Sequence, residues 1–250
     1  MSGGPPLFIT PDWPPIPGVR ALTTVRHGGV SAPPLESLNF GTAVDDAPAA
    51  LEENRRRLAD AARLPSQPRW LRQVHGTTVA DLDALLQPGS ADAAVARLPG
   101  VVCALLTADC LPVLLARRDG DAVAAAHAGW RGLAAGVIEA ALDALGAPGD
   151  ELTAWLGPAI GPANFEVGGE VRAAFLVTDA GATEAFVENA RGRWQCDLYA
   201  LARRRLQKRG VTHIYGGEHC TFAETDRFYS HRRDGGRTGR MATLIWRESL

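Results

Sequence analysis

A cysteine and a histidine, two residue types that bind metals or act in nucleophilic catalysis, flank a predicted β-hairpin. Cys110 lies nine residues before Asp119, and His127 lies seven residues after Gly120. An Asp-Gly pair between two apolar runs is a strong hairpin signal, and directly opposed residues of a hairpin have Cβ atoms about 4.5–5.5 Å apart. With a slightly offset register, the thiolate and the imidazole are close enough to share a metal ion or to form a Cys–His catalytic pair.

His75 is a candidate third ligand, because it ends another apolar alternation in the sequence. Two nitrogens and one sulfur with an open fourth position describe a catalytic zinc site rather than a closed structural one. The chain contains six histidines, so it can supply one mononuclear metal site but not the several metals of a copper oxidase. Each residue also has an ordinary alternative, Cys110 as a buried small hydrophobe and His127 as a structural histidine.

A segment rich in glycine and arginine, residues 229–240, is a candidate anion site. Its four arginines include Arg232 and Arg233. A forked guanidinium binds phosphate or carboxylate through two parallel hydrogen bonds, and glycines leave backbone N–H groups accessible to the same anion. The segment lacks the lysine and the spacing of a P-loop, and a solvated loop is the alternative. Arg26 lies in a second glycine turn, at residues 26–29, and is a further candidate.

The composition is that of an ordinary globular protein and excludes several classes of protein. The 250 residues are 46% apolar and 22% charged with a net charge of −2, which argues against a disordered chain and against nucleic acid or an anionic membrane as a partner. No apolar run approaches the roughly 18 residues that cross a bilayer, and the proline-rich start lacks the basic region of a signal peptide. The four scattered cysteines are too few for a disulfide scaffold, so we expect reduced thiols and a cytoplasmic location.

Interleaved strands and helices must position these candidates. Apolar runs and alternations predict strands at residues 19–25, 70–80, 101–107, 111–116, 122–126, 152–156, 211–215 and 242–246. Periodicity and capping residues predict a helix that begins near Pro48 and helices at residues 130–145, 169–177, 182–190 and 197–209. Because no repeat or long linker interrupts the chain, we predict one mixed α/β domain over residues 1–250, with an extended proline-rich segment at 1–18.

Several segments, in order along nearly the whole chain, carry a resemblance to a known family. The most specific are QVHG at residues 73–76, TADC at 107–110 and HAGWRG at 127–132. The others lie at residues 24–31, 37–39, 157–162, 165–168 and 229–240. With these motifs the chain resembles the YfiH family, also called the laccase-domain or polyphenol oxidase family. Its members include purine nucleoside phosphorylases and the peptidoglycan editing factor.

The resemblance implies a fold, a cofactor and an activity. The fold is a single α/β mixed (α+β) domain of mixed β-sheets flanked by helices, similar to the CNF/YfiH-like cysteine hydrolase fold. The cofactor is zinc, with copper as the alternative, held by His75, Cys110 and His127. The activity is phosphorolysis of adenosine, inosine, guanosine and methylthioadenosine, with some adenosine deamination. We expect a monomer whose partners are a small nucleoside and phosphate.

Phosphorolysis sets requirements that the predicted site residues must meet. Phosphate attacks C1′ of the ribose while the purine leaves, so the enzyme must hold phosphate, donate a proton and exclude water. We assign catalytic roles to His75, Cys110 and His127. Binding of the nucleoside or phosphate is assigned to Arg26, Asn39, Gln73, Arg232 and Arg233, with the arginines as the phosphate candidates. Asp109 and Glu166 are the candidates for the general acid.

Two other enzyme classes compete with the phosphorylase. In a cysteine amidase, the Cys110 thiolate attacks an amide and His127 acts as the base, a chemistry that suits the editing of peptidoglycan precursors. A copper polyphenol oxidase is the third reading, against which the small number of histidines argues. A thiolate already bound to zinc is a poor nucleophile, so the metal content of the protein separates the phosphorylase from the amidase.

Overall fold

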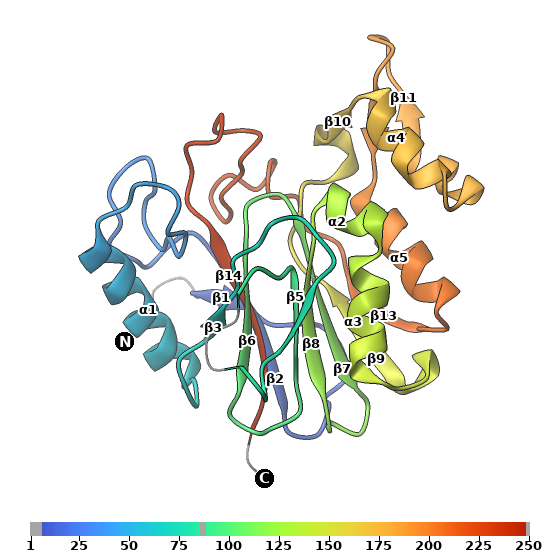
Figure 1. Cartoon of the computed structure of the whole chain (residues 1–250). Coiled ribbons are helices and arrows are strands. Elements are labelled where there is room, and N and C mark those ends of the chain that lie inside the picture. The colour runs from blue at the N-terminus through green and yellow to red at the C-terminus, as the bar shows by residue number, and fades with distance from the viewer. Residues whose placement is uncertain (1–6, 86–88, 249–250) are drawn as a thin grey trace.

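Two β-sheets pack face to face through the centre of the molecule, and helices cover the outer face of each sheet (Figure 1). The computed structural model describes residues 7–85 and 89–248, so the first six residues of the predicted N-terminal segment lie outside the described part. The first sheet has five strands in the order β1 (Phe8–Ile9), β2 (Val19–Thr24), β14 (Met241–Arg247), β6 (Val102–Thr107) and β3 (Arg69–Trp70). The second has six, in the order β13 (His213–Gly216), β9 (Leu152–Leu156), β7 (Leu111–Arg117), β8 (Val123–Ala128), β5 (Ala93–Ala96) and β4 (Val79–Asp81).

The helices and a small third sheet complete the fold. The α-helices are α1 (Pro48–Ala62), α2 (Trp130–Ala135), α3 (Val137–Leu145), α4 (Gly169–Leu176) and α5 (Leu198–Lys208). Short 3₁₀ turns lie at Gly149–Glu151, Pro162–Asn164 and Ala180–Ala185. The third sheet has the order β10 (Glu166–Val167), β12 (Trp194–Cys196) and β11 (Phe186–Glu188). This sheet and α4 lie beyond one end of the two large sheets (Figure 1).

Alternation along the central strands explains why the sheets form layers. In β8, Val123 and Ala125 belong to the cluster between the two large sheets, whereas Ala124 and Ala126 face the helices. Successive side chains of a strand point to opposite faces, so a strand buried on both faces must be apolar at every position. By the same alternation, His127 belongs to the series that faces the other sheet.

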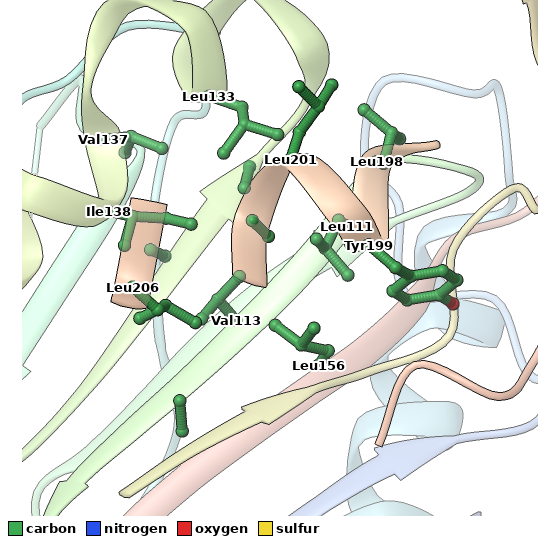
Figure 2. Close-up of a cluster of buried hydrophobic side chains, with 14 of the residues drawn as sticks. Leu111, Val113, Leu133, Val137, Ile138, Leu156, Leu198, Tyr199, Leu201 and Leu206 are labelled. Atoms are coloured by element: carbon green, nitrogen blue, oxygen red, sulfur yellow. The ribbon is translucent and has the colours of Figure 1, made fainter. Parts of the chain in front are cut away.

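Helices close both outer faces of this sandwich. On the five-stranded sheet, Leu58 and Ala62 of α1 belong to the same buried cluster as residues of β2, β6 and β14. On the six-stranded sheet, side chains from α2, α3 and α5 gather over β7, β8 and β9, as Figure 2 shows for Val137, Ile138 and Leu206. The fold is therefore a mixed α/β fold, which confirms the predicted class.

Most predicted elements are confirmed. Strands at residues 19–25, 101–107, 111–116, 122–126, 152–156, 211–215 and 242–246 correspond to β2, β6, β7, β8, β9, β13 and β14. Pro48 begins α1, and the predicted helices at 169–177 and 197–209 correspond to α4 and α5. No helix in the described part of the chain has the length and apolarity that a membrane crossing requires.

Three predicted elements are wrong, each for a local reason. The helix at 130–145 is two helices, because Gly136 adopts φ of 104° and caps α2 before α3 begins. The strand at 70–80 is interrupted between β3 and β4, because the carboxylate of Asp92 binds the backbone N–H groups there that a neighbouring strand would otherwise bind. The helix at 182–190 is a 3₁₀ turn followed by β11, where buried Phe186 and exposed Val187 alternate like a strand.

A charged substitution on the buried face of α3 tests this packing. Val137 is 0% exposed, so Val137→Asp places an unpaired carboxylate in the core, which costs several kcal/mol. We expect the variant to lose soluble expression. Val177→Asp is the matched control, because Val177 at the end of α4 is 84% exposed and should leave the melting temperature nearly unchanged. A soluble Val137→Asp protein with the wild-type melting temperature would contradict the packing of α3.

Candidate metal centre

Three side chains that can bind a metal ion meet where the two large sheets connect. His75 lies in the loop between β3 and β4, Cys110 in the connection from β6 to β7, and His127 in β8. Their donor atoms all lie within 4.8 Å of one another, and His75 Nε2 is 3.9 Å from Cys110 Sγ. In the β7–β8 hairpin His127 lies opposite Pro112, so Cys110 falls just beyond the end of the ladder. The predicted hairpin therefore brings Cys110 and His127 together.

A buried carboxylate, that of Asp92, holds two of these ligands. Asp92 immediately precedes β5 and is 0% exposed. Its Oδ1 accepts a hydrogen bond from His127 Nδ1 at 2.9 Å. The same carboxylate accepts hydrogen bonds from the backbone N–H groups of Val74, His75 and Gly76 at 3.1, 2.8 and 2.7 Å. The bond from Nδ1 assigns the proton of a neutral His127 to that nitrogen, which leaves Nε2 to bind a metal ion.

The charge of Asp92 follows from these hydrogen bonds. Burial by itself raises the pKa of the carboxyl, but the bonds from His127 and from three backbone N–H groups outweigh burial and lower the pKa to about 2. Asp92 is therefore ionised at neutral pH and makes its imidazole partner more basic. The loop that it binds contains His75 at φ of 61°, a left-handed conformation uncommon for residues other than glycine. The Asp92 carboxylate stabilises this strained loop.

Cys110 and His127 shift the protonation of each other. Burial raises the pKa of the Cys110 thiol, but attraction to His127 and hydrogen bonds with His127 and His75 lower the pKa to about 6. Burial lowers the pKa of His127, whereas the Cys110 thiolate and the Asp92 carboxylate raise it to about 9. Cys110 is therefore a thiolate at neutral pH, and the thiolate is the form of cysteine that binds metals and attacks electrophiles.

Asp109 fixes the turn that positions Cys110. This residue has φ of 86° and is 8% exposed. Its Oδ1 accepts a hydrogen bond from the Thr221 hydroxyl at 2.6 Å, and its Oδ2 accepts one from the backbone N–H of Arg232 at 2.7 Å. Its carbonyl oxygen accepts a third from the N–H of Ile160 at 2.9 Å. Asp109 thus joins three separate segments to the turn beside Cys110.

Close packing beneath the ligands favours a glycine at position 129, directly before α2. A Cβ atom there would lie 3.0 Å from both Cys110 Sγ and His75 Cδ2. The φ of Gly129 is −60°, which any residue adopts, so the space rather than the backbone selects glycine. The sequence HAGWRG therefore contains one ligand, His127, and the glycine that makes room for the other two.

A cavity of about 650 Å³ opens beside the three ligands. This volume lies within the range of ligand pockets, roughly 300–1,000 Å³. Its apolar lining comes from Leu71, Leu106, Ala108, Trp130, Ile160, Phe165 and Leu198. Its cationic lining comes from Arg72, Arg131, Arg232 and Arg240. An apolar pocket with a few converging charged groups beside a metal-binding cluster is the arrangement expected of an active site.

Two of the five predicted binding residues line this cavity. The guanidinium of Arg232 lies 5.3 Å from the ring centroid of Phe165, and its Nη1 donates to the carbonyl oxygen of Glu166 at 2.9 Å. Gln73 also lines the cavity, but its side-chain amide is bound to the backbone N–H and C=O of Leu106, each at 2.8 Å. Gln73 therefore extends the ladder of β6, and of the two only Arg232 brings a charge to the cavity.

Arg26 and Arg233 do not reach the cavity. The guanidinium of Arg26 donates to the carbonyl oxygens of Glu36 and Thr225. That of Arg233 donates to the carboxylate of Asp234 and to three carbonyl oxygens, those of Thr221, Phe222 and Phe228. Because protein acceptors occupy both guanidinium groups, their observed role is to hold loops together.

Asn39 does not line the cavity but binds two residues that do. It is 0% exposed, and its Oδ1 accepts hydrogen bonds from the backbone N–H groups of Gly41 and Arg240, each at 2.8 Å. Both of these residues line the cavity, whereas Asn39 itself does not. The amide thus fixes two cavity segments that are far apart in sequence.

Sequence reasoning missed Asp92 and Arg240. Asp92 is a single acid within the apolar run Ala91–Ala96, and a charge in a buried run signals a specific partner. Arg240 lies in the arginine-rich segment, where counting charges could not distinguish it from Arg233. Which arginine of that segment reaches the cavity depends on how the loop folds before β14.

Comparisons with known proteins give a consistent result. The sequence pattern of a family described as multi-copper polyphenol oxidoreductase laccase matches residues 20–248. A Pseudomonas aeruginosa protein named purine nucleoside phosphorylase is 58% identical over 96% of this chain and 98% of its own length. An Escherichia coli protein named purine nucleoside phosphorylase YfiH is 52% identical over the same shares. A crystal structure of a Neisseria meningitidis protein superposes with a TM-score of 0.93 at 48% identity, covering 97% of this chain and all of that one.

Removing the charge of Asp92 tests its role in holding the ligands. Asp92→Asn keeps the size of the side chain, but its NH₂ group would face an N–H donor that now donates a hydrogen bond to the carboxylate. We expect a 10- to 100-fold loss of zinc affinity, about the range for outer partners of metal ligands, measured by competition with a chelator. Asp121→Asn is the control, since the Asp121 side chain is 68% exposed. Wild-type zinc affinity in a folded Asp92→Asn protein would contradict this role.

The reactivity of the metal-free protein tests the thiolate at position 110. The rate of Cys110 alkylation by iodoacetamide should reach half its maximum near pH 6, and added zinc should suppress it. Burial raises the pKa of Cys103 and Cys196, so these two thiols should not react at pH 7. Peptide mass analysis after labelling identifies the modified residue, with Cys110→Ser as the control. A midpoint near the ordinary thiol value of about 8.5 would contradict the assigned charge state.

Proposed function

This chain belongs to the multi-copper polyphenol oxidoreductase laccase family, and from its likeness to the relatives named phosphorylases we propose that it is a zinc-dependent purine nucleoside phosphorylase. Membership in the family confirms the resemblance predicted from the motifs. The observation that carries the proposal is the cavity, in which cationic and aromatic side chains lie beside His75, Cys110 and His127. A phosphate and a purine nucleoside need these two kinds of lining.

The donor set of the cluster fits zinc. Two imidazole nitrogens and one thiolate are ligands that zinc prefers, and three protein ligands leave a fourth position for water or substrate. Within the described residues, His75, Cys110 and His127 form the only group of three such side chains, so the several coppers of an oxidase have no second site there. When bound, zinc would supply a Lewis acid beside the cavity.

The residues of the chain itself orient and shield the reactants. Asp92 orients His127, and Trp130 and Phe165 provide apolar walls that keep water from the glycosidic bond. The two candidates for the general acid do not fit that role. Both carboxylate oxygens of Asp109 already accept hydrogen bonds from protein groups, and Glu166 lies outside the cavity, where it pairs with arginines 191 and 193. We assign Asp109 a positioning role instead.

The proposed substrates are adenosine, inosine, guanosine and methylthioadenosine. All four present a planar purine, which the aromatic part of the cavity can contact on its face. Deamination of adenosine is a secondary activity in this proposal, and it would use another arrangement than the common zinc deaminases, whose Pro-Cys-x-x-Cys signature the sequence lacks. We further propose a monomer in the cytoplasm, where a thiolate ligand stays reduced.

One observation favours a second function, a cysteine amidase. Cys110, His127 and Asp92 form a series of nucleophile, base and orienting carboxylate, the arrangement of a Cys–His catalytic pair with its third group. The Cys110 sulfur cannot both bind zinc and attack an amide, because a zinc-bound thiolate is a weak nucleophile. The state of Cys110 in the working enzyme therefore decides between the two functions.

A phosphate-dependent assay with and without zinc tests the proposal. The purified protein should contain about one zinc per chain and convert inosine and phosphate to hypoxanthine and ribose 1-phosphate. The variants His75→Ala, Cys110→Ala and His127→Ala should each lower zinc content and activity, because two ligands remain. Release of free ribose without phosphate would contradict phosphorolysis. Full activity of the chelated protein on an amide substrate would establish the amidase instead.

A further inference from the structure

The cavity spans the ends of both large sheets, and its two ends differ in chemistry. One end is built by the segment 41–44 and by Arg240, which directly precedes β14 of the five-stranded sheet. The other end is built by Trp130, which begins α2 after β8 of the six-stranded sheet, and by Phe165. In Figure 1 both α2 and the loop that leads into β14 lie at the same end of the sheets. The ligand cluster lies where the two sheets connect, because Cys110 is in the connection from β6 to β7 and His127 is in β8.

Arg240 differs from the other three arginines of the cavity. It is half-buried, whereas Arg72, Arg131 and Arg232 are exposed. Its Nη1 donates to the carbonyl oxygens of the two preceding residues at 2.8 and 3.0 Å, which sets the plane of the guanidinium. Among the described residues, no acceptor binds its Nε or Nη2, and no carboxylate pairs with it. A partly desolvated cation with two free donors in one plane fits a bidentate oxyanion.

The backbone around Arg240 is built to hold this side chain in place. Asn39 Oδ1 accepts both the N–H of Arg240 and the N–H of Gly41. A Cβ atom at Gly41 would lie 2.8 Å from Cγ of Arg240, so glycine lets the arginine lie across the loop. In the part of the chain that the structure describes, no protein group accepts the N–H of Thr42, Ala43 or Val44. The residues 42–44 line the cavity together with Arg240, so the N–H groups of this segment are available to the same anion.

Arg240 is also next to the ligand cluster. The β14–β6 register opposes Met241 to Thr107, so Arg240 falls opposite Ala108, two residues before Cys110. An anion held by Arg240 would therefore lie beside Cys110, at the reacting centre rather than at the rim of the cavity.

The other end of the cavity is suited to a planar ring. The guanidinium of Arg131 lies 4.4 Å from the ring centroid of Trp130, and that of Arg232 lies 5.3 Å from that of Phe165. Ile160 also lines the cavity and is 1% exposed. Aromatic and guanidinium planes are the surfaces on which nucleobases stack.

We propose that Arg240 and the segment 41–44 form the phosphate subsite of this enzyme, and that Trp130 and Phe165 form the purine subsite on the far side of the ligand cluster. This assignment rests on the proposed phosphorylase function. It places the ribose between the two ends, where phosphate can reach C1′ on one face while the purine leaves toward the aromatic end. The bond from C1′ to the purine nitrogen breaks with its electron pair left on the purine, and a phosphate oxygen forms the new bond to C1′. The proton that hydrogen phosphate loses balances the proton that the purine nitrogen gains.

Substitutions at each end separate the two subsites. In the zinc-loaded protein, Arg240→Gln should weaken the binding of inorganic phosphate by about 10- to 100-fold in calorimetry, the effect of losing charge-assisted hydrogen bonds, and change inosine binding less than about threefold. Arg232→Gln removes an exposed arginine of the same cavity and should leave phosphate binding within about threefold of wild type. Phe165→Leu should weaken inosine binding more than phosphate binding. Zinc content and melting temperature monitor folding in each variant.

The outcomes distinguish the subsite from the function. If Arg240→Gln binds phosphate like the wild type, or if Arg232→Gln weakens phosphate binding equally, the phosphate subsite is refuted even where ribose 1-phosphate is formed. If the wild type binds phosphate through Arg240 but forms no ribose 1-phosphate from any purine nucleoside, the subsite stands and the proposed function is refuted. Arg240→Lys sharpens the first comparison, since it keeps the charge and loses the fork, and should recover only part of the affinity.

Discussion

The candidate site depends on one buried carboxylate. Asp92 accepts a hydrogen bond from the imidazole of His127 and three from the backbone of the loop that contains His75. Without these acceptors, the buried imidazole of His127 would lose its partner, which costs about 1–3 kcal/mol for a buried group left unsatisfied. The three part-buried N–H groups of the loop would lose their partner as well. One charge thus orients one ligand and shapes the loop that presents another.

The packing of the two sheets explains how Cys110, the third ligand, is positioned. The chain leaves the five-stranded sheet at Thr107 and enters the six-stranded sheet at Leu111, so the turn between them lies at the seam of the two sheets. Asp109 takes a left-handed conformation in this turn and binds segments that belong to the C-terminal half of the chain. Cys110 is therefore held by contacts with residues more than a hundred positions away in sequence.

The sequence was sufficient for features with a local cause and insufficient for those set by distant partners. The hairpin that joins Cys110 to His127 follows from two apolar runs and an Asp-Gly turn, and the structure has that hairpin. The interruption around His75 could not be predicted from its own alternation, because Asp92, 17 residues away, determines it. The roles of the arginines could not be predicted for the same reason, since Arg233 and Arg240 carry the same charge. In the folded loop, carbonyl groups and Asp234 bind the guanidinium of Arg233, whereas Arg240 lines the cavity.

X-ray absorption at the zinc edge of the zinc-loaded protein tests the central claim most directly, because it reports the atoms bound to the metal. The geometry of His75, Cys110 and His127 predicts one sulfur and two imidazole nitrogens per zinc, with one further light atom from solvent or substrate. The sulfur contribution should disappear in Cys110→Ser. A zinc site without sulfur in the wild type, or one with two or more sulfurs, would contradict the account.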